Sequence, residues 1–230
     1  MNRRGPLQTL IDLARGPQGK PAIILFCSTV LMTAWWHFGS PQFYLRHFPT
    51  SGSGPSAAPA IYCFASCFVL LGVIPALIVK LGFRESLADY GVRLGNRVRT
   101  IRSFLILAPF FVLGAYLSSS NASIAAYYPI NRVACNSPET FAVHAFCYLL
   151  YYLGWEFHFR GFLQFGLRDS FGGGSALLVQ VMASTLLHLG KPDVETVSAI
   201  LAGVFWGWLA YRTRSLLSGL GQHYLLGLSL

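Results

Sequence analysis

The sequence predicts an all-α protein, a polytopic bundle of transmembrane helices, on three observations. Only 11% of its 230 residues are charged, whereas a soluble domain carries about 25%. Hydrophobic residues make up 54%, and the mean hydropathy is +0.52. Seven stretches approach the roughly 20 apolar residues that cross a bilayer. These values exclude soluble, disordered, coiled-coil and disulfide-rich secreted proteins.

The expected spans follow one another with short connections, and helices are required because lipid offers the backbone no hydrogen-bonding partner. The first three are largely free of charged residues. The fourth is long and contains Glu156, His158 and Arg160, and the later ones are shorter, rich in glycine and carry His188 and His223. The stretches lie roughly at 21–38, 60–80, 103–120, 140–167, 174–189, 196–211 and 215–230.

The distribution of basic residues predicts a cytoplasmic N-terminus. With that orientation, 14 of the 17 lysines and arginines face the cytoplasm, and only Arg46, Arg132 and Lys191 lie outside. The net charge of +9 therefore indicates topology and attraction to the lipid bilayer, with no nucleic-acid partner. We expect a multi-pass integral membrane protein, in the plasma (inner) membrane if the host is bacterial.

Two regions are predicted. Residues 1–20 form a cytoplasmic segment in which Leu7, Leu10, Ile11 and Ala14 have helical spacing, as in a helix lying on the membrane surface. Residues 21–230 form a single membrane-embedded domain.

Three ionisable side chains are predicted at similar depth within the bilayer. From 1.5 Å per residue, Glu156, His188 and His223 lie roughly 18, 21 and 13 Å from the inner boundary. An ionisable residue in a span is a functional hypothesis by default. A carboxylate and two histidines in a dry cavity suit the activation of water. The same residue types also suit a divalent metal such as zinc, so the cofactor stays open.

Glu156 has a structural interpretation as well. The four-residue step to Arg160 puts both side chains on one helix face, where they can form an internal ion pair. Pairing alone would account for both residues without any catalysis.

The segment Trp155-Glu156-Phe157-His158-Phe159-Arg160-Gly161 resembles the CAAX protease and bacteriocin-processing family of intramembrane proteases, which includes the type II CAAX prenyl endopeptidases. Glu156 and Arg160 match the second Glu and the Arg of its Glu-Glu-x-x-x-Arg motif. His188 and His223 match the histidines of its second and third motifs. The resemblance covers roughly residues 80–230, with the motifs in 140–230, and it implies an intramembrane protease with catalytic Glu156, Arg160, His188 and His223.

The sequence departs from the family pattern at three positions. Trp155 replaces the first Glu, usually assigned as the catalytic base; Ser184 stands at the Phe of the second motif, and Gly227 at the final Asn. Helix geometry turns Trp155 toward the place of the base and Glu156 toward Arg160. Glu195, shortly after His188, is a candidate replacement, so Glu156 or Glu195 supplies the base. The alternative for Glu195 is an acid in the first turn of the next helix, on the outer surface.

The expected function is that of an endopeptidase that hydrolyses a peptide bond of a membrane-associated protein or peptide with carboxylate- and histidine-activated water. The main alternative is a catalytically altered pseudoprotease that acts as a membrane scaffold or a bacteriocin-immunity protein. The third alternative is a transporter with a protonatable Glu156. Such transporters have a pair of spans interrupted by Gly or Pro at corresponding positions of two halves, and the sequence shows no such pair.

Overall fold

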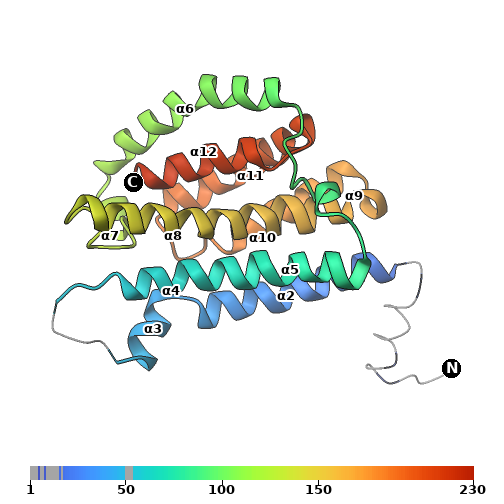
Figure 1. The fold of residues 1–230 in the computed structure, drawn as a ribbon, viewed down its shortest axis with the longest axis horizontal. Coiled ribbons are helices and arrows are strands. Elements are labelled where there is room, and N and C mark those ends of the chain that lie inside the picture. Colours follow the sequence, from blue (N-terminus) through green and yellow to red (C-terminus); the bar gives the residue numbers. More distant parts are fainter. Residues whose placement is uncertain (1–4, 6–7, 9–15, 17, 50–53) are drawn as a thin grey trace.

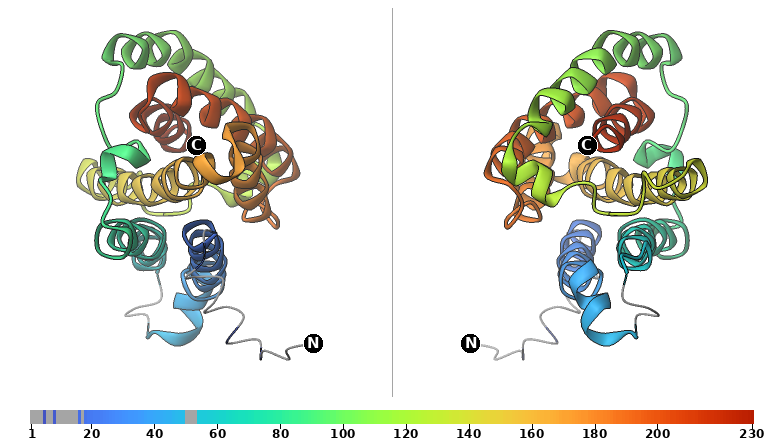
Figure 2. Two further views of the ribbon diagram at one scale, coloured as in Figure 1. Left: turned by 90° about the vertical axis from the view of Figure 1, so that its right-hand side faces the viewer. Right: turned by 90° about the vertical axis from the view of Figure 1, so that its left-hand side faces the viewer.

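The computed structural model describes residues 5, 8, 16, 18–49 and 54–230. Every regular element in these residues is helical, which confirms the predicted all-α class. Seen end-on, most helices run side by side along the long axis of the molecule (Figure 2). The segment 1–20, where a surface helix is expected, falls largely outside the described residues.

The N-terminal part forms one side of the bundle (Figure 1). It consists of α2 (Gly19–Phe38), the short α3 (Pro41–His47) and a continuous rod of α4 (Ala58–Cys67), η1 (Phe68–Val73), α5 (Ile74–Leu77) and η2 (Ile78–Phe83). η1 and η2 are π-helical, and Pro75, which has no N–H to donate, is the second residue after η1. A π-helical turn is one way in which a helix absorbs such an interruption.

The centre of the bundle is a second rod. It begins at α8 (Pro138–Glu156), where Ser137 and Thr140 form a capping box, and continues through η4 (Phe157–Phe165) and α9 (Gly166–Phe171). All nine residues of η4, another π-helix, are buried. Gly172 ends the rod with a φ of 77°, a left-handed conformation that favours glycine.

Three helices after this rod complete the core. They are α10 (Gly173–Leu186), α11 (Asp193–Thr213) and α12 (Leu217–Leu228). α11 begins at Asp193, whose side chain makes no cap, since the N-cap residue is Pro192. Between the two rods the chain forms η3 (Leu87–Tyr90), α6 (Arg97–Ser119), which lies over α12, and α7 (Ala122–Tyr127).

Four described helices are long and apolar enough to cross a membrane, namely Gly19–Phe38, Ala58–Phe83, Arg97–Ser119 and Asp193–Thr213. The other three expected spans are also helical. One is the central rod with its buried ionic residues, and the other two are α10 and α12, of 14 and 12 residues. At 1.5 Å per residue these two measure only about 21 and 18 Å. Because both are shorter than the roughly 20 residues that cross a bilayer, α10 and α12 depend on packing against the surrounding helices of the bundle.

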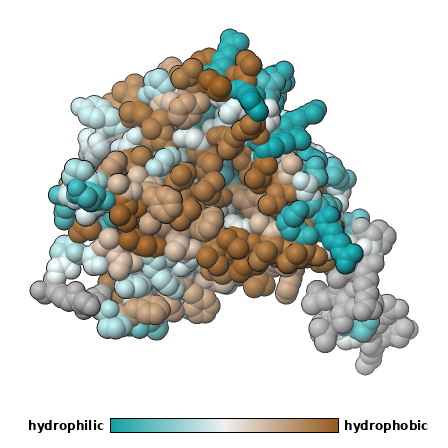
Figure 3. Space-filling model, in the orientation of Figure 1, coloured by the Kyte–Doolittle hydropathy of each residue, from teal (hydrophilic) through white to brown (hydrophobic). Residues whose placement is uncertain are grey.

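The surface is as apolar as a lipid-facing protein requires. Hydrophobic side chains cover much of the face seen in Figure 3, and hydrophilic ones gather at the end where α2 begins. In the most apolar 18-residue stretch of α6, only 6% is buried inside the protein. Neighbouring helices pack closely on Gly203 and Gly207, whose carbonyls accept hydrogen bonds from Gln180 and Gln164 at 2.9 and 2.8 Å.

Candidate active site

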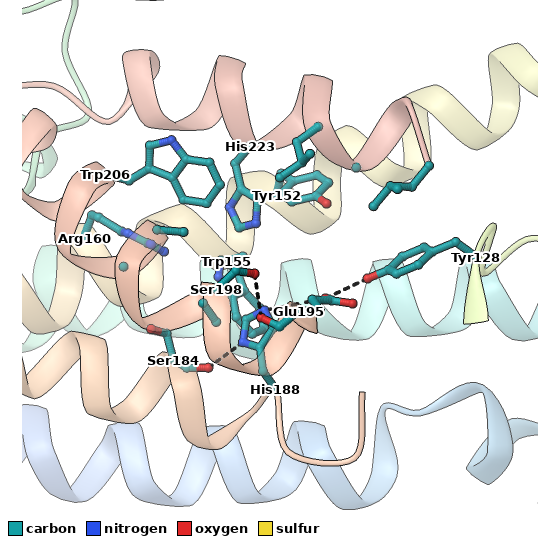
Figure 4. Close-up of a pocket in the computed structure, with 16 residues that line it drawn as sticks. Tyr128, Tyr152, Trp155, Arg160, Ser184, His188, Glu195, Ser198, Trp206 and His223 are labelled. Atoms are coloured by element: carbon teal, nitrogen blue, oxygen red, sulfur yellow. Dashed lines mark hydrogen bonds and ion pairs between the residues drawn. The ribbon is translucent and has the colours of Figure 1, made fainter. Parts of the chain in front are cut away.

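A cavity of about 530 Å³ opens in the middle of the bundle. Its walls come from the central rod, α10, α11, α12 and the loop that follows α7 (Figure 4). Four of the five predicted site residues line it, namely Arg160, His188, Glu195 and His223. Segments up to 102 residues apart in the sequence, from Tyr128 to Leu230, thus meet at one place.

Glu156 is placed differently, behind His223. Its Oε1 lies 2.8 Å from Nδ1 of His223 and 3.3 Å from Nη1 of Arg160. Glu156 is absent from the described residues that line the cavity, and its side chain is only 2% exposed. The predicted ion pair with Arg160 is therefore present, while the carboxylate reaches the cavity only through the histidine ring.

Aromatic rings fix the orientation of His223. Its ring stacks on Trp206 with centroids 4.1 Å apart and meets the edge of Tyr152 at 4.5 Å. Trp206 is held in turn by a hydrogen bond of 3.2 Å from its Nε1 to Gln222. With Nδ1 at Glu156, the free Nε2 atom is the one available to a molecule in the cavity.

His188 and Glu195 form a second, separate pair across the cavity. Nδ1 of His188 donates to the carbonyl oxygen of Ser184 at 2.8 Å, which leaves Nε2 as an acceptor when the ring is neutral. This Nε2 lies 3.8 Å from Oε1 of Glu195 (Figure 4). The separation is too long for a direct hydrogen bond, but a water at about 2.8 Å from both atoms would fit between them.

Glu195 is held by two donors that the sequence analysis missed. The hydroxyl of Tyr128 and Nζ of Lys191 each lie 2.8 Å from its Oε1. Burial raises the pKa of Tyr128 well above its usual value, as does the neighbouring carboxylate, so the hydroxyl remains a donor. The i,i+4 step from Lys191 to Glu195 was visible in the sequence, but no local signal relates Tyr128 to either residue.

Trp155 occupies the wall between the two pairs. It lines the cavity, is 1% exposed and meets the ring of His188 edge-on with centroids 5.4 Å apart. Trp155 therefore faces the cavity and Glu156 faces Arg160, as the helix geometry predicted. The place of a carboxylate in the usual family motif is filled here by an indole.

Gly227 lies on the cavity wall beside Tyr152. A Cβ atom at this position would overlap the Tyr152 hydroxyl, which donates to Tyr148 at 3.2 Å. Any side chain at position 227, the usual Asn included, would therefore require Tyr152 to move.

The predicted metal alternative fits these residues poorly. In the part of the chain that the structure describes, no three His, Cys, Asp or Glu side chains converge as metal ligands. In addition, the ammonium of Lys191 lies 2.8 Å from Oε1 of Glu195, the carboxylate oxygen nearer His188, so a metal cation between Glu195 and His188 would have to compete with a positive charge. No step of the reaction is therefore assigned to a metal.

One family model matches the part of the chain that carries this site. Residues 137–228 match the family model of the Type II CAAX prenyl endopeptidase Rce1-like proteins. This part of the chain belongs to that family. The Rce1-like domain contains the central rod, α10, α11 and α12, and so all five predicted site residues. Membership implies an integral membrane protein with protease activity of the intramembrane CAAX type. No curated protein and no solved structure matches the chain.

Proposed function

We propose that the protein is an intramembrane endopeptidase that hydrolyses a peptide bond of a membrane-associated protein or peptide, with Glu195 as the base. The observation that carries this proposal is the His188–Glu195 pair, open to the cavity and spaced for one water. Water would donate one hydrogen to Nε2 of His188 and the other to the carboxylate of Glu195.

The proposed reaction begins when Glu195 removes a proton from this water. The water oxygen bonds to the carbonyl carbon of the peptide, and the carbonyl electron pair moves to oxygen. Arg160 lines the opposite wall and would stabilise the resulting oxyanion with its guanidinium N–H groups. His223 would do so in its protonated form, with Nδ1–H donated to Glu156 and Nε2–H to the oxyanion. When the C–N bond breaks, the leaving nitrogen takes the proton from Glu195, which returns the enzyme to its starting state.

Glu156 acts in this proposal as a positioning residue. Its carboxylate holds Nδ1 of His223 at 2.8 Å and would stabilise the ring when it becomes protonated. Arg160 in turn favours the charged form of that carboxylate. A bacterial inner-membrane location and a cytoplasmic N-terminus are part of the same proposal.

The test compares the protein termini in membranes of cells that produce the wild type, Glu195→Gln, Glu156→Gln or His188→Ala at matched levels. Asp193→Asn is the matched control, because Asp193 is exposed and lies in the same helical turn as Glu195. We expect new peptide ends with the wild type and Asp193→Asn that Glu195→Gln and His188→Ala abolish.

Two other outcomes would change the proposal. If Glu195→Gln kept full activity while Glu156→Gln lost it, the base would not be Glu195. If no peptide ends depended on the protein and all variants remained folded, the scaffold or immunity alternative would be favoured, consistent with Trp155 at the usual position of the base.

A further inference from the structure

Three basic residues at the end of the bundle opposite the start of α2 gather around one cleft. Arg46 belongs to α3, Arg132 follows α7, and Lys191 lies in the turn between α10 and α11. Two adjoining hollows, with empty volumes of about 760 and 900 Å³, are lined by Arg132 and Lys191 and by Arg46 and Lys191, respectively. They share Trp35, Pro41, Gln42, Cys63, Tyr127 and Lys191, and together they are called the outer cleft.

The outer cleft carries an excess of positive charge. No Asp or Glu is among the described residues that line it. Arg132 donates to backbone carbonyls, including that of Tyr128 at 3.2 Å, and Arg46 has no carboxylate partner in the described part of the chain. Lys191 is the exception, because it pairs with Glu195, which faces the other cavity. Such a surface complements an anion.

The orientation of the protein in the membrane does not explain the excess of positive charge at the outer cleft. Basic residues near the ends of spans concentrate on the cytoplasmic side, and the other 14 in this sequence follow that rule in the predicted orientation. The three exceptions come from three different segments, and all three reach the same cleft. Recognition of a ligand accounts for their convergence.

A wall of aromatic rings separates the outer cleft from the catalytic cavity. Trp155 stacks on Tyr151 with centroids 5.7 Å apart and an interplanar angle of 19°, and it meets Trp35 edge-on, also at 5.7 Å. All three side chains are buried. A peptide bound in the cavity could not extend into the cleft without displacing them, so the anion belongs to a ligand other than the substrate.

The position of the cleft indicates what that ligand is. Trp35 and Trp36 lie in the last turn of α2, a span that ends at Phe38, and tryptophan concentrates at the level of the lipid headgroups. At the rim, Trp36 and Leu189 are 49% and 52% exposed, which provides an apolar surface for acyl chains beside the basic residues.

We propose that the outer cleft binds the phosphate-bearing headgroup of an anionic phospholipid through Arg46, Arg132 and Lys191. Guanidinium groups pair well with phosphate because they offer several N–H donors in one plane. The site goes beyond the proposed protease function and does not depend on it. The lipid site would nevertheless lie next to the proposed active site, because Lys191 lines the outer cleft and also donates to Glu195.

The test uses the full-length protein in nanodiscs that contain photoreactive phosphatidylglycerol, with the labelled peptides mapped by mass spectrometry. We expect labelling beside the cleft, within residues 36–47 and 187–191, and about tenfold less of it in Arg46→Gln and in Arg46→Gln/Arg132→Gln. Arg97→Gln/Arg102→Gln is the matched control. These arginines lie on α6, at the opposite end of the bundle, so labelling at the cleft should be unchanged.

Arg46 is exposed on the short α3, so its variant tests the site without disturbing the carbonyls that Arg132 holds. Equal labelling by photoreactive phosphatidylcholine, or no loss in Arg46→Gln, would overturn the proposal. Displacement of the label by millimolar inorganic phosphate would indicate a free phosphate site instead. Displacement by soluble pentaglutamate but not by unlabelled phosphatidylglycerol would assign the cleft to an acidic peptide.

Discussion

Removing either charge of the Glu156–Arg160 pair should strongly destabilise the protein. The two side chains are 2% and 3% exposed, and the charged atoms lie 3.3 Å apart. At an effective dielectric constant of about 20, this separation corresponds to an attraction of about 5 kcal/mol. Loss of Glu156 leaves Arg160 buried without a carboxylate, and loss of Arg160 leaves the Glu156 carboxylate with only the ring of His223. We therefore expect Glu156→Gln and Arg160→Gln each to lower the free energy of unfolding by about 3–5 kcal/mol.

The double variant distinguishes an ion pair from two independent buried polar groups. With both charges removed, neither residue leaves an unpaired ion in the core. We therefore expect Glu156→Gln/Arg160→Gln to lose about 3 kcal/mol less than the sum of the two single variants. The Gln side chain at position 156 keeps a carbonyl oxygen that can accept from His223, which limits the change to the charge.

The assay is reversible unfolding in mixed detergent micelles, measured for the wild type, both single variants and the double variant. Arg168 and Asp169 provide a matched control, because Nε of the arginine lies the same 3.3 Å from Oδ1 of the aspartate while their side chains are 37% and 79% exposed. An exposed pair contributes no more than about 1 kcal/mol. If the coupling energies of the two pairs were equal, burial would not be the source of the strength assigned to Glu156–Arg160.

Three further results are expected. Tyr128→Phe removes a hydrogen bond to the Glu195 carboxylate, worth about 1.5–3 kcal/mol, and should slow peptide cleavage about tenfold or more while the protein stays folded. Gly227→Ala places a Cβ atom against a buried tyrosine hydroxyl and should lower the free energy of unfolding by about 1–3 kcal/mol. Burial opposes the charge of Glu85, but hydrogen bonds from Lys20 and a nearby tyrosine hold the pKa of its carboxyl below the usual value. The stability from this pair should be complete above about pH 4.3 and disappear as the pH falls through the lowered pKa, as thermal unfolding at pH 6 and pH 3 would measure.

Each of these results has its own control. Tyr127→Phe lies next to Tyr128 but makes no hydrogen bond to Glu195, so a comparable loss of activity there would contradict the role of the Tyr128 hydroxyl. Gly114→Ala, on lipid-facing α6, meets no atom within 4 Å and should be tolerated. Lys20→Gln should reduce the loss of stability between pH 6 and pH 3, and an unchanged loss would exclude the Lys20–Glu85 pair as its source.

The sequence alone determined the class of the protein and most of the residues that meet at the site. The length of the apolar stretches predicts transmembrane helices, because a backbone in lipid must satisfy its own hydrogen bonds. The step from Glu156 to Arg160 predicts a pair, since i and i+4 share a helix face. The similar depths of Glu156, His188 and His223 predicted their association, and the structure brings the two histidines to one cavity, with Glu156 behind His223.

Only the tertiary structure decided which carboxylate faces the cavity. Glu156 and Glu195 could not be distinguished from sequence, because the answer depends on how α12 places His223 between Glu156 and the open space. Tyr128 is likewise brought to Glu195 from a loop 67 residues away, and no local pattern encodes that contact. Helical periodicity specifies the direction of a side chain relative to its own helix, whereas the surroundings of that side chain are set by the packing of all the others.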